Sequence, residues 1–378
     1  MNNSAIQIGK SEMLNTVYSN NEWSPLKEVI LGSPLNYNLP SFDLSFKLFF
    51  QKNLQEVYAR VDSKGKPQVK PIYLKELEED ILGIQKAFED LNIIVHRPKV
   101  LKQVVNYKTP YYQATMIPAL NIRDQVVILG NRIVELAPQV RCRYFENDLL
   151  KPIFYEFFKR GNCNWFEMPK PMMLDSSFDT ESLKETYPIE NTEYHPEIEL
   201  NFNVGHEMMI DAAQLVRFGK DIIVNVSTNN HRLGAEWLIR MFPEYNFHIL
   251  RSVTDNHLDS YIVPLCEGVL LVRNNFIKSI LPDFLKKWKL IFAPQPKENH
   301  FPKYGFDDIR LASPFIDINV LSIDGKKIMC NTLFPELVDL LEKEGFDPIP
   351  VQHRHRRLFS GGFHCFTLDI VREKEWTI

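Results

Sequence analysis

The stretch INVLSI-DG-KKIMC, residues 318 to 330, predicts the clearest β-hairpin in the chain, because Asp324-Gly325 is a strong turn signal between two β-rich apolar runs. A helix with proline in its first turn is predicted to follow at Pro335–Glu344, and a further strand at Pro348–Val351. Hairpin, helix and strand in this order form one small module, which is the unit to seek in the rest of the chain.

The same order of elements recurs along the sequence. Residue identity between the units is negligible, so the recurrence is structural and is not a sequence repeat. The frequent hairpins, and the lack of a GxGxxG motif after a strand, disfavour a Rossmann fold. The sequence therefore predicts small αβ modules arranged radially, with loops that converge on a central pocket. The other predicted helices are Leu74–Leu91, Glu146–Arg160, His231–Phe242 and Ile277–Trp288, and the other strands and hairpins lie within Trp23–Gly32, Ile93–His96, Arg123–Val134, Asp221–Ser227, Phe247–Arg251, Ile262–Arg273, Leu290–Ala293 and Cys365–Arg372.

Size and composition are those of an ordinary globular protein. The 378 residues suffice for one large domain or two smaller ones, and a net charge of -4 gives no electrostatic reason to expect nucleic acid as a partner. No stretch is apolar over the length of a membrane span, and Met1–Tyr18 lacks the apolar run of a signal peptide. The 5 cysteines are scattered, and there is no CxxC pair or HExxH motif, which favours a reduced, cytoplasmic protein without a metal site.

The stretch Gly361–Asp369 (GGFHCFTLD) carries the strongest candidate for chemistry. Two glycines allow a tight turn and a close approach of the backbone to a ligand, and a buried strand is predicted from Cys365 to Val371. A cysteine at such a loop-to-strand junction can face a pocket, and its thiolate is a strong nucleophile when neighbouring groups lower its pKa. The alternative is that Cys365 is one more small buried apolar residue.

Four further polar residues stand out by type and context: Asp124, Asp211, His257 and Asp259. His257 and Asp259, two apart on an extended segment, would line one side of a pocket. Carboxylates in a cleft suit a guanidinium cation, a thiolate could attack its central carbon, and a histidine could protonate the departing amine. Each residue has an alternative: His257 as a surface histidine, Asp211 as the N-cap of a helix at Ala212–Phe218, and Asp124 and Asp259 as turn residues beside strands.

The sequence resembles the arginine:X amidinotransferases, a family that includes the glycine amidinotransferases and the inosamine-phosphate enzymes of antibiotic pathways. The resemblance implies a five-bladed α/β propeller with pseudo-fivefold symmetry, built from ββαβ-type modules. It also implies an N-terminal tail at residues 1–20, a single amidinotransferase domain at residues 21–378, and a homodimer. It extends from about Trp23 to Arg372 and is most specific at Arg123-Asp124, Val127–Glu135, Arg141–Glu146, Met168–Pro171, Phe218–Asp221 and Gly361–Cys365.

The resemblance further implies roles for individual residues. Cys365 is the expected nucleophile, His257 the general acid and base, and Asp211 the carboxylate that pairs with this histidine. Asp124 and Asp259 are expected to hold the guanidinium group.

Five other positions are expected to contact substrate. Ser313 falls where the family has a substrate-contacting serine, while Thr254 and Asn256 replace an Asn and a Met that precede the catalytic histidine in the glycine enzymes. Phe276 stands, by ungapped count, where the family has an arginine for the substrate carboxylate, and Arg273 is the nearest arginine. These differences in pocket polarity argue against glycine as the acceptor.

The whole sequence is similar to the cyanobacterial amidinotransferases of saxitoxin biosynthesis, whose acceptor is an arginine-derived amino ketone. The expected activity is transfer of the amidino group of L-arginine to a primary amine of a small metabolite, through an amidino-thioether on Cys365, with release of ornithine and without metal or cofactor. Two alternatives stay open. One is a hydrolase of the same superfamily, in which water resolves the intermediate and gives citrulline. The other is a non-catalytic propeller that only binds.

Two segments have open roles. Residues 34–71 form an insertion that is expected to be a surface excursion with its aromatic residues packed on the body of the protein. The polar stretch Gln295–Asp308 is either a lid that excludes water from the intermediate or an ordinary long loop.

Overall fold

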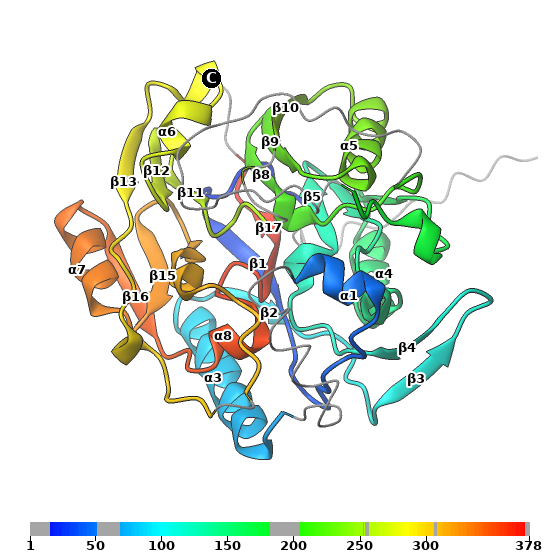
Figure 1. The fold of residues 1–378 in the computed structure, drawn as a ribbon. Coiled ribbons are helices and arrows are strands. Elements are labelled where there is room, and N and C mark those ends of the chain that lie inside the picture. The colour runs from blue at the N-terminus through cyan, green and yellow to red at the C-terminus, as the bar shows by residue number, and fades with distance from the viewer. Residues whose placement is uncertain are drawn as a thin grey trace, which may run out of the picture.

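The helices and strands form a ring of small modules in the computed structural model (Figure 1). The structure describes residues 16–50, 69–181, 205–251, 253, 257–305 and 308–374. In this part of the chain, five three-stranded sheets surround a common centre, and the helices that connect their strands lie at the periphery. One hairpin, β3 (Val105–Lys108) with β4 (Gln113–Met116), stands apart from these sheets.

All five sheets have the same topology. Two strands pair antiparallel, and a third strand joins the second in parallel after a helical crossover. The expected five-bladed arrangement of ββαβ modules is therefore confirmed, as separate sheets around one centre. The strands are β5 (Val126–Leu129), β6 (Arg132–Glu135) and β7 (Asn164–Glu167); β8 (Leu215–Phe218), β9 (Asp221–Val226) and β10 (Asn246–Arg251); β11 (Ile262–Cys266), β12 (Val269–Val272) and β13 (Lys289–Phe292); β14 (Leu321–Ser322), β15 (Lys327–Asn331) and β16 (Asp347–Val351); and β17 (Thr367–Arg372), β1 (Leu26–Leu31) and β2 (Ile94–His96).

The fifth sheet closes the ring, because it combines strands from both ends of the chain. β17 pairs antiparallel with β1, with Thr367 opposite Leu31, and β1 pairs in parallel with β2. The C-terminal strand thus takes the place that the first strand of the hairpin has in the other modules. This closure brings the segment before β17 to the centre of the molecule.

The crossover helices follow from apolar spacing and from proline at the helix start. In α3 (Pro71–Asp90) the predicted apolar face is buried, with Leu77, Ile84 and Phe88 fully enclosed. Proline also occupies the first turn of α4 (Lys151–Arg160) and α7 (Pro335–Lys343), where a missing N–H costs no hydrogen bond. The remaining crossovers are α5 (Asn229–Met241) and α6 (Ile277–Ile280).

The predicted helix at Ile277–Trp288 is wrong in extent. α6 ends at Ile280, and a separate 3-10 turn covers Asp283–Leu285. Pro282 lies between the two and adopts an extended ψ of 158°. Proline has no backbone N–H and disfavours a helical conformation in the residue before it, so the helix stops.

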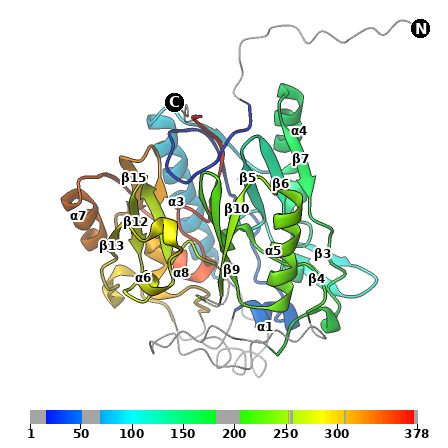
Figure 2. The same ribbon diagram turned by 90° about the horizontal axis from the view of Figure 1, so that it is seen from above.

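The first half of the insertion forms a short helix, α1 (Leu44–Phe49), at one face of the ring (Figure 2). Its N-cap is Asp43, whose carboxylate accepts a hydrogen bond from the backbone N–H of Phe46 at 3.0 Å. Phe46 is 2% exposed and belongs to the core between β1, α3 and the turn that carries Cys365. The aromatic residues of this segment thus pack on the body of the protein, as expected, and Phe46 enters its core. Residues 51–68 lie outside the described residues.

None of the helices in the described part of the chain combines the length and the apolar character that a membrane crossing requires.

Candidate active site

The turn that leads into β17 presents Cys365 at the centre of the ring. The backbone N–H of Cys365 donates to Oδ1 of Asn319 at 2.9 Å, and the residue is 2% exposed. A Cβ added at Gly362 would lie 2.7 Å from Oδ1 of this same Asn319, and one at Gly361 would collide with the side chain of Asn121. The two glycines are therefore needed for the close packing that holds the cysteine in place.

His257 lies between two carboxylates. Its Nε2 is 2.9 Å from Oδ2 of Asp211, and its Nδ1 is 3.8 Å from Oδ1 of Asp124. The donor atoms of Asp124, His257 and Cys365 all lie within 4.8 Å of one another. The structure thus brings together residues that are far apart in the sequence, as the resemblance implies.

Asp211 is an N-cap, as the alternative had it, but the helix considered for Ala212–Phe218 is wrong in extent. A 3-10 turn covers Ala212–Gln214, and β8 follows directly and pairs with β9. Strand β8 is buried along its whole length, which favours a sheet over an amphipathic helix. The side chain of Gln214 accepts a hydrogen bond from the backbone of Asp211 at 2.9 Å and fixes its position.

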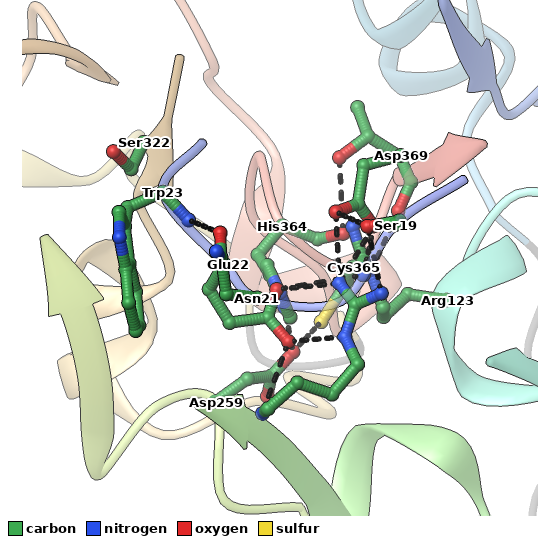
Figure 3. Close-up of polar contacts among 12 residues, drawn as sticks. Ser19, Asn21, Glu22, Trp23, Arg123, Asp259, Ser322, His364, Cys365 and Asp369 are labelled. Carbon is green, nitrogen blue, oxygen red and sulfur yellow. Dashed lines mark hydrogen bonds and ion pairs between the residues drawn. The ribbon is translucent and has the colours of Figure 1, made fainter. Parts of the chain in front are cut away.

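Asp259 is the nearest acid to the thiol. Its Oδ2 lies 3.2 Å from Sγ of Cys365 and 2.9 Å from Nδ1 of His364, as Figure 3 shows. Nε2 of His364 is in turn 3.3 Å from Oε2 of Glu22. A chain of buried polar groups therefore runs from the thiol through Asp259 and His364 to Glu22.

Burial and the surrounding carboxylates shift the pKa values of the two reactive groups. Burial, together with Asp259 and Asp124, raises the pKa of the Cys365 thiol well above its ordinary range. Burial alone would lower the pKa of His257, but Asp124, Asp211 and Asp259 outweigh it and raise the pKa to about 9. At neutral pH the site thus holds a protonated thiol and an imidazolium.

Two carboxylate oxygens at the site have no hydrogen-bond partner in the described part of the chain. Oδ1 of Asp124 and Oδ1 of Asp211 are buried, and neither has a hydrogen-bond partner within the described ranges. The other oxygen of Asp124 accepts a hydrogen bond from Arg143, which also binds Glu146. Buried acceptors without donors are costly, so the site is suited to a ligand that supplies N–H groups.

A pocket opens next to these groups. Asp124 and His257 line it, and the insertion contributes Phe46, Phe49 and Phe50 to its wall. The ring of Phe49 meets that of His257 edge-on, with centroids 5.5 Å apart. The remaining lining residues are Tyr37, Pro40, Ile117, Leu120, Asn121, Val140, Cys142, Arg143, Leu311, Phe359 and Ser360.

The residues expected to contact substrate are less closely gathered. Arg273 lies over the rings of Tyr261 and Phe315, and its Nη2 is 3.4 Å from Oγ of Ser313. Phe276 packs in a separate apolar cluster around Trp23 and does not line the pocket.

The remaining predictions near the site concern Thr254, Asn256 and the polar stretch Gln295–Asp308. Thr254 and Asn256 lie outside the described residues. Within Gln295–Asp308, Asp308 forms an ion pair with Lys70 just before α3, and Phe301 is buried. These contacts anchor parts of that segment on the body of the protein.

Sequence reasoning missed three groups that support the site. His364 stands in the motif beside Cys365, Arg143 stands in the quoted stretch Arg141–Glu146, and Asn319 follows the 3-10 turn at Pro314–Ile318. For His364 and Arg143, the available signal is an ionisable residue inside a stretch that is specific to the family resemblance. Asn319 acts through long-range contacts that no local pattern reveals.

One carboxylate, one imidazole and one thiol are also a donor set that a transition metal such as zinc accepts. Within the residues described, Asp124, His257 and Cys365 are the group whose donor atoms come this close. The expectation of a metal-free site therefore stays a prediction that a chelator can test.

Comparisons with known proteins identify the family. No protein-family model matches the sequence. The mitochondrial glycine amidinotransferase of Xenopus laevis is 32% identical over 366 residues, which cover 94% of this chain and 83% of the relative. Inosamine-phosphate amidinotransferase 1 of Streptomyces griseus is 30% identical, with 95% and 98% covered. The solved structure of an amidinotransferase from Microseira wollei in the saxitoxin biosynthetic pathway superposes with a TM-score of 0.79 at 30% identity, covering 96% of this chain and 99% of that one. The chain described here belongs to the amidinotransferase family.

Proposed function

We propose that the protein transfers the amidino group of L-arginine to a primary amine of a small metabolite and releases ornithine. The observation that carries this proposal is the pair of buried oxygens without hydrogen-bond partners on Asp124 and Asp211, beside Cys365 and His257 in the described part of the chain. A guanidinium group supplies the N–H donors and the positive charge that these oxygens call for. The kinship with amidinotransferases supports an arginine-type donor.

In the first half-reaction the sulfur of Cys365 bonds to the guanidino carbon. The bond from this carbon to Nδ of the ornithine moiety breaks, and the imidazolium of His257 gives its proton to that nitrogen. The cysteine then carries an amidino-thioether. A pKa of about 9 for His257 keeps the proton available at neutral pH.

The same groups support the second half-reaction. The nitrogen of the acceptor amine bonds to the amidino carbon, and the bond from this carbon to sulfur breaks. The amine proton passes to the now neutral His257, which regenerates the imidazolium, and the departing thiolate takes up a proton from water as the product leaves, which restores the resting thiol. Both steps are substitutions at one carbon, and His257 serves the proton transfers at the two nitrogens.

The arriving guanidinium also activates the nucleophile. Burial contributes most to the raised pKa of the free thiol, and Asp259 and Asp124 raise it further, because a thiolate beside two carboxylates is electrostatically unfavourable. A guanidinium cation held by the same carboxylates cancels this repulsion. The thiol therefore loses its proton to water when arginine binds, and the thiolate forms in the complex with arginine and not in the free enzyme.

Arg273 and Ser313 are suited to the carboxylate of the arginine donor. Within the described residues, Arg273 forms no ion pair with a carboxylate, and its hydrogen-bond partner is Ser313. The side chains of Tyr261 and Phe315 fix its guanidinium plane by stacking. Leu311, two residues before this serine, lines the pocket.

Further parts of the proposal concern the setting of the reaction. The likeness to the enzyme of the saxitoxin pathway supports a secondary-metabolite precursor as the acceptor. The 5 free cysteines favour a reducing compartment, in keeping with the cytoplasm. A homodimer is expected and can be checked by light scattering.

The test separates the half-reactions. Arginine alone should load one amidino group onto Cys365, located by peptide mapping, and an amine should discharge it. Double-reciprocal plots against both substrates should be parallel, as in a ping-pong scheme. Release of citrulline at the same rate without an amine would establish a hydrolase instead. Dialysis against a chelator should leave both steps unchanged, and loss of activity on chelation would show that a metal belongs in the site.

A further inference from the structure

The pocket beside His257 has a mostly apolar wall. Phe46, Phe49 and Phe50 come from α1 and its C-terminal end, while Leu311 and Phe359 come from the opposite end of the chain. The rings of α1 form a packed cluster, with centroids 4.6 Å apart for Phe46 and Phe50 and 4.8 Å for Phe49 and Phe50. Packed rings of this kind give a wall of fixed shape.

The aromatic wall is adjacent to the reacting groups. The ring of Phe49 contacts the ring of His257, and Asp124 lines the same pocket. Sγ of Cys365 lies within 4.8 Å of the ligand atoms of Asp124 and His257, which line the pocket. A molecule that enters through this pocket, and whose amine nitrogen reaches the amidino carbon on Cys365, lays the atoms next to that nitrogen against the aromatic wall. The wall is thus positioned to contact the acceptor.

The arginine that lines the pocket is already paired with carboxylates. Arg143 is the one Lys or Arg among the described lining residues, and its guanidinium binds both Asp124 and Glu146. His257, an imidazolium in the free enzyme, is neutral in the loaded enzyme under the proposed mechanism. An acceptor carboxylate or phosphate on this wall would therefore lose its hydration without gaining a cationic side chain, and Asp124 would repel it. Such a transfer is strongly unfavourable.

From the apolar wall and the occupied cation, and resting on the amidino transfer proposed above, we infer that the acceptor is a primary amine on an apolar alkyl or aryl body without an acidic group. The donor and the acceptor then use different parts of the site. The carboxylate of arginine is directed to Arg273 and Ser313, while the body of the acceptor packs on α1.

The test uses two amines of equal chain length, hexylamine and 6-aminohexanoate, added to enzyme already loaded by arginine. Hexylamine should discharge Cys365 with a kcat/KM at least about tenfold higher, the scale of a few buried methylene groups. Equal rates, faster discharge by 6-aminohexanoate, or no discharge by either amine would overturn the inference. Failure of arginine to load Cys365 would instead refute the proposed function, so the two failures are distinguishable.

Variants of two wall residues test whether the selectivity between the two amines arises at the aromatic wall. Phe50→Ala should raise the KM for hexylamine about tenfold and leave the KM for arginine within about twofold, since an aromatic contact of this size is lost. Phe158→Ala, at a 54% exposed phenylalanine of α4, is the matched control and should change neither constant. Leu311→Lys places a cation on the wall and should favour 6-aminohexanoate. Unchanged selectivity in both wall variants would show that the acceptor lies elsewhere.

Discussion

At the scale of single residues, the site combines a nucleophile with groups that oppose its ionisation. Asp259 accepts a hydrogen bond from the thiol of Cys365, and His364, which contacts the same carboxylate oxygen, lowers the pKa of Asp259 against the effect of burial and keeps it ionised. The carboxylates that attract a cationic substrate are thus the same groups that keep the thiol protonated. The reactivity of Cys365 therefore depends on whether a cationic substrate occupies the site, because the same carboxylates act on both.

Asp259→Asn should separate these two effects. Loss of one negative charge beside Cys365 lowers the pKa of the thiol, so alkylation by iodoacetamide at pH 7 should become faster. Arginine turnover should nevertheless fall, because a charge-assisted contact to the guanidinium is lost. Rates of inactivation and of ornithine release measure the two effects, with Cys365→Ser as the unreactive control. Slower alkylation in Asp259→Asn would contradict this account.

His257 should impose a descending limb on the pH profile of ornithine release. The step needs the imidazolium, so the rate should be flat below the pKa of about 9 and fall about tenfold per pH unit above it. Asp211→Asn removes a charge and a hydrogen bond that favour the imidazolium, so the limb should move to lower pH. Single-turnover rates between pH 6 and 10 would show this, and an unmoved limb would assign it to another group.

At the scale of elements, the modules explain what the sequence could predict. The Asp-Gly hairpin, α7 and β16 follow from local signals, and they form as predicted, with β14 shortened to Leu321–Ser322. The nucleophile and its turn also have a local pattern, two glycines before a buried strand. β7, β8 and the hairpin of β3 and β4 were missed. These strands have four residues each, too few for a clear apolar alternation, and their β propensity depends on packing context.

The site was harder to predict than the fold. The expected catalytic group consists of single residues on separate modules: Cys365, His257, Asp211 and Asp124. No local sequence pattern places them in one site, and their roles follow from the family resemblance. The contribution of α1 to the pocket could not be foreseen, because an aromatic run such as Leu44–Phe50 is equally typical of ordinary core.

The tight turn before β17 should be sensitive to a single methyl group. Gly362→Ala places a Cβ 2.7 Å from Oδ1 of Asn319, the group that holds the backbone of Cys365. The turn must shift, which should cost about 1–3 kcal/mol of stability and slow loading of Cys365 at least about tenfold. Gly83→Ala in α3, where the nearest atom is 4.0 Å away, is the control and should be neutral or stabilising. Wild-type loading in Gly362→Ala would mean that the turn does not position the nucleophile.

At the scale of the whole molecule, buried ion pairs join the modules at the centre. Arg217 of β8 binds Glu22 at 2.7 Å and Asp369 of β17 at 2.8 Å, and Arg123 also pairs with Asp369 (Figure 3 shows Arg123, Glu22 and Asp369). Ser19, which the sequence assigned to the tail, is fully buried and donates to Asp369. The polar centre thus links the segment before β1, the β8 module and the strand behind the nucleophile.

Glu22→Gln should destabilise the whole molecule. The change keeps the shape of the side chain but leaves the buried charge of Arg217 with one partner fewer, which typically costs about 3–5 kcal/mol. Urea denaturation at pH 7 should show the loss. Cys365→Ser, which leaves this network intact, should unfold close to the wild-type midpoint.

The pH dependence of that loss tests its electrostatic origin. Burial alone would raise the pKa of Glu22, but Arg217 and His364 hold it well below its ordinary value. A carboxyl group whose pKa is lower in the folded than in the unfolded protein contributes stability above the unfolded pKa of about 4.3, and this contribution declines as the pH falls further. The stability gap between wild type and Glu22→Gln should therefore be constant from pH 7 to about 5 and narrow by about 1.4 kcal/mol per pH unit below about pH 4. A gap that stays the same down to pH 3 would show that Glu22 acts through packing and not through its charge, and the centre of the ring would then not be held together by ion pairs.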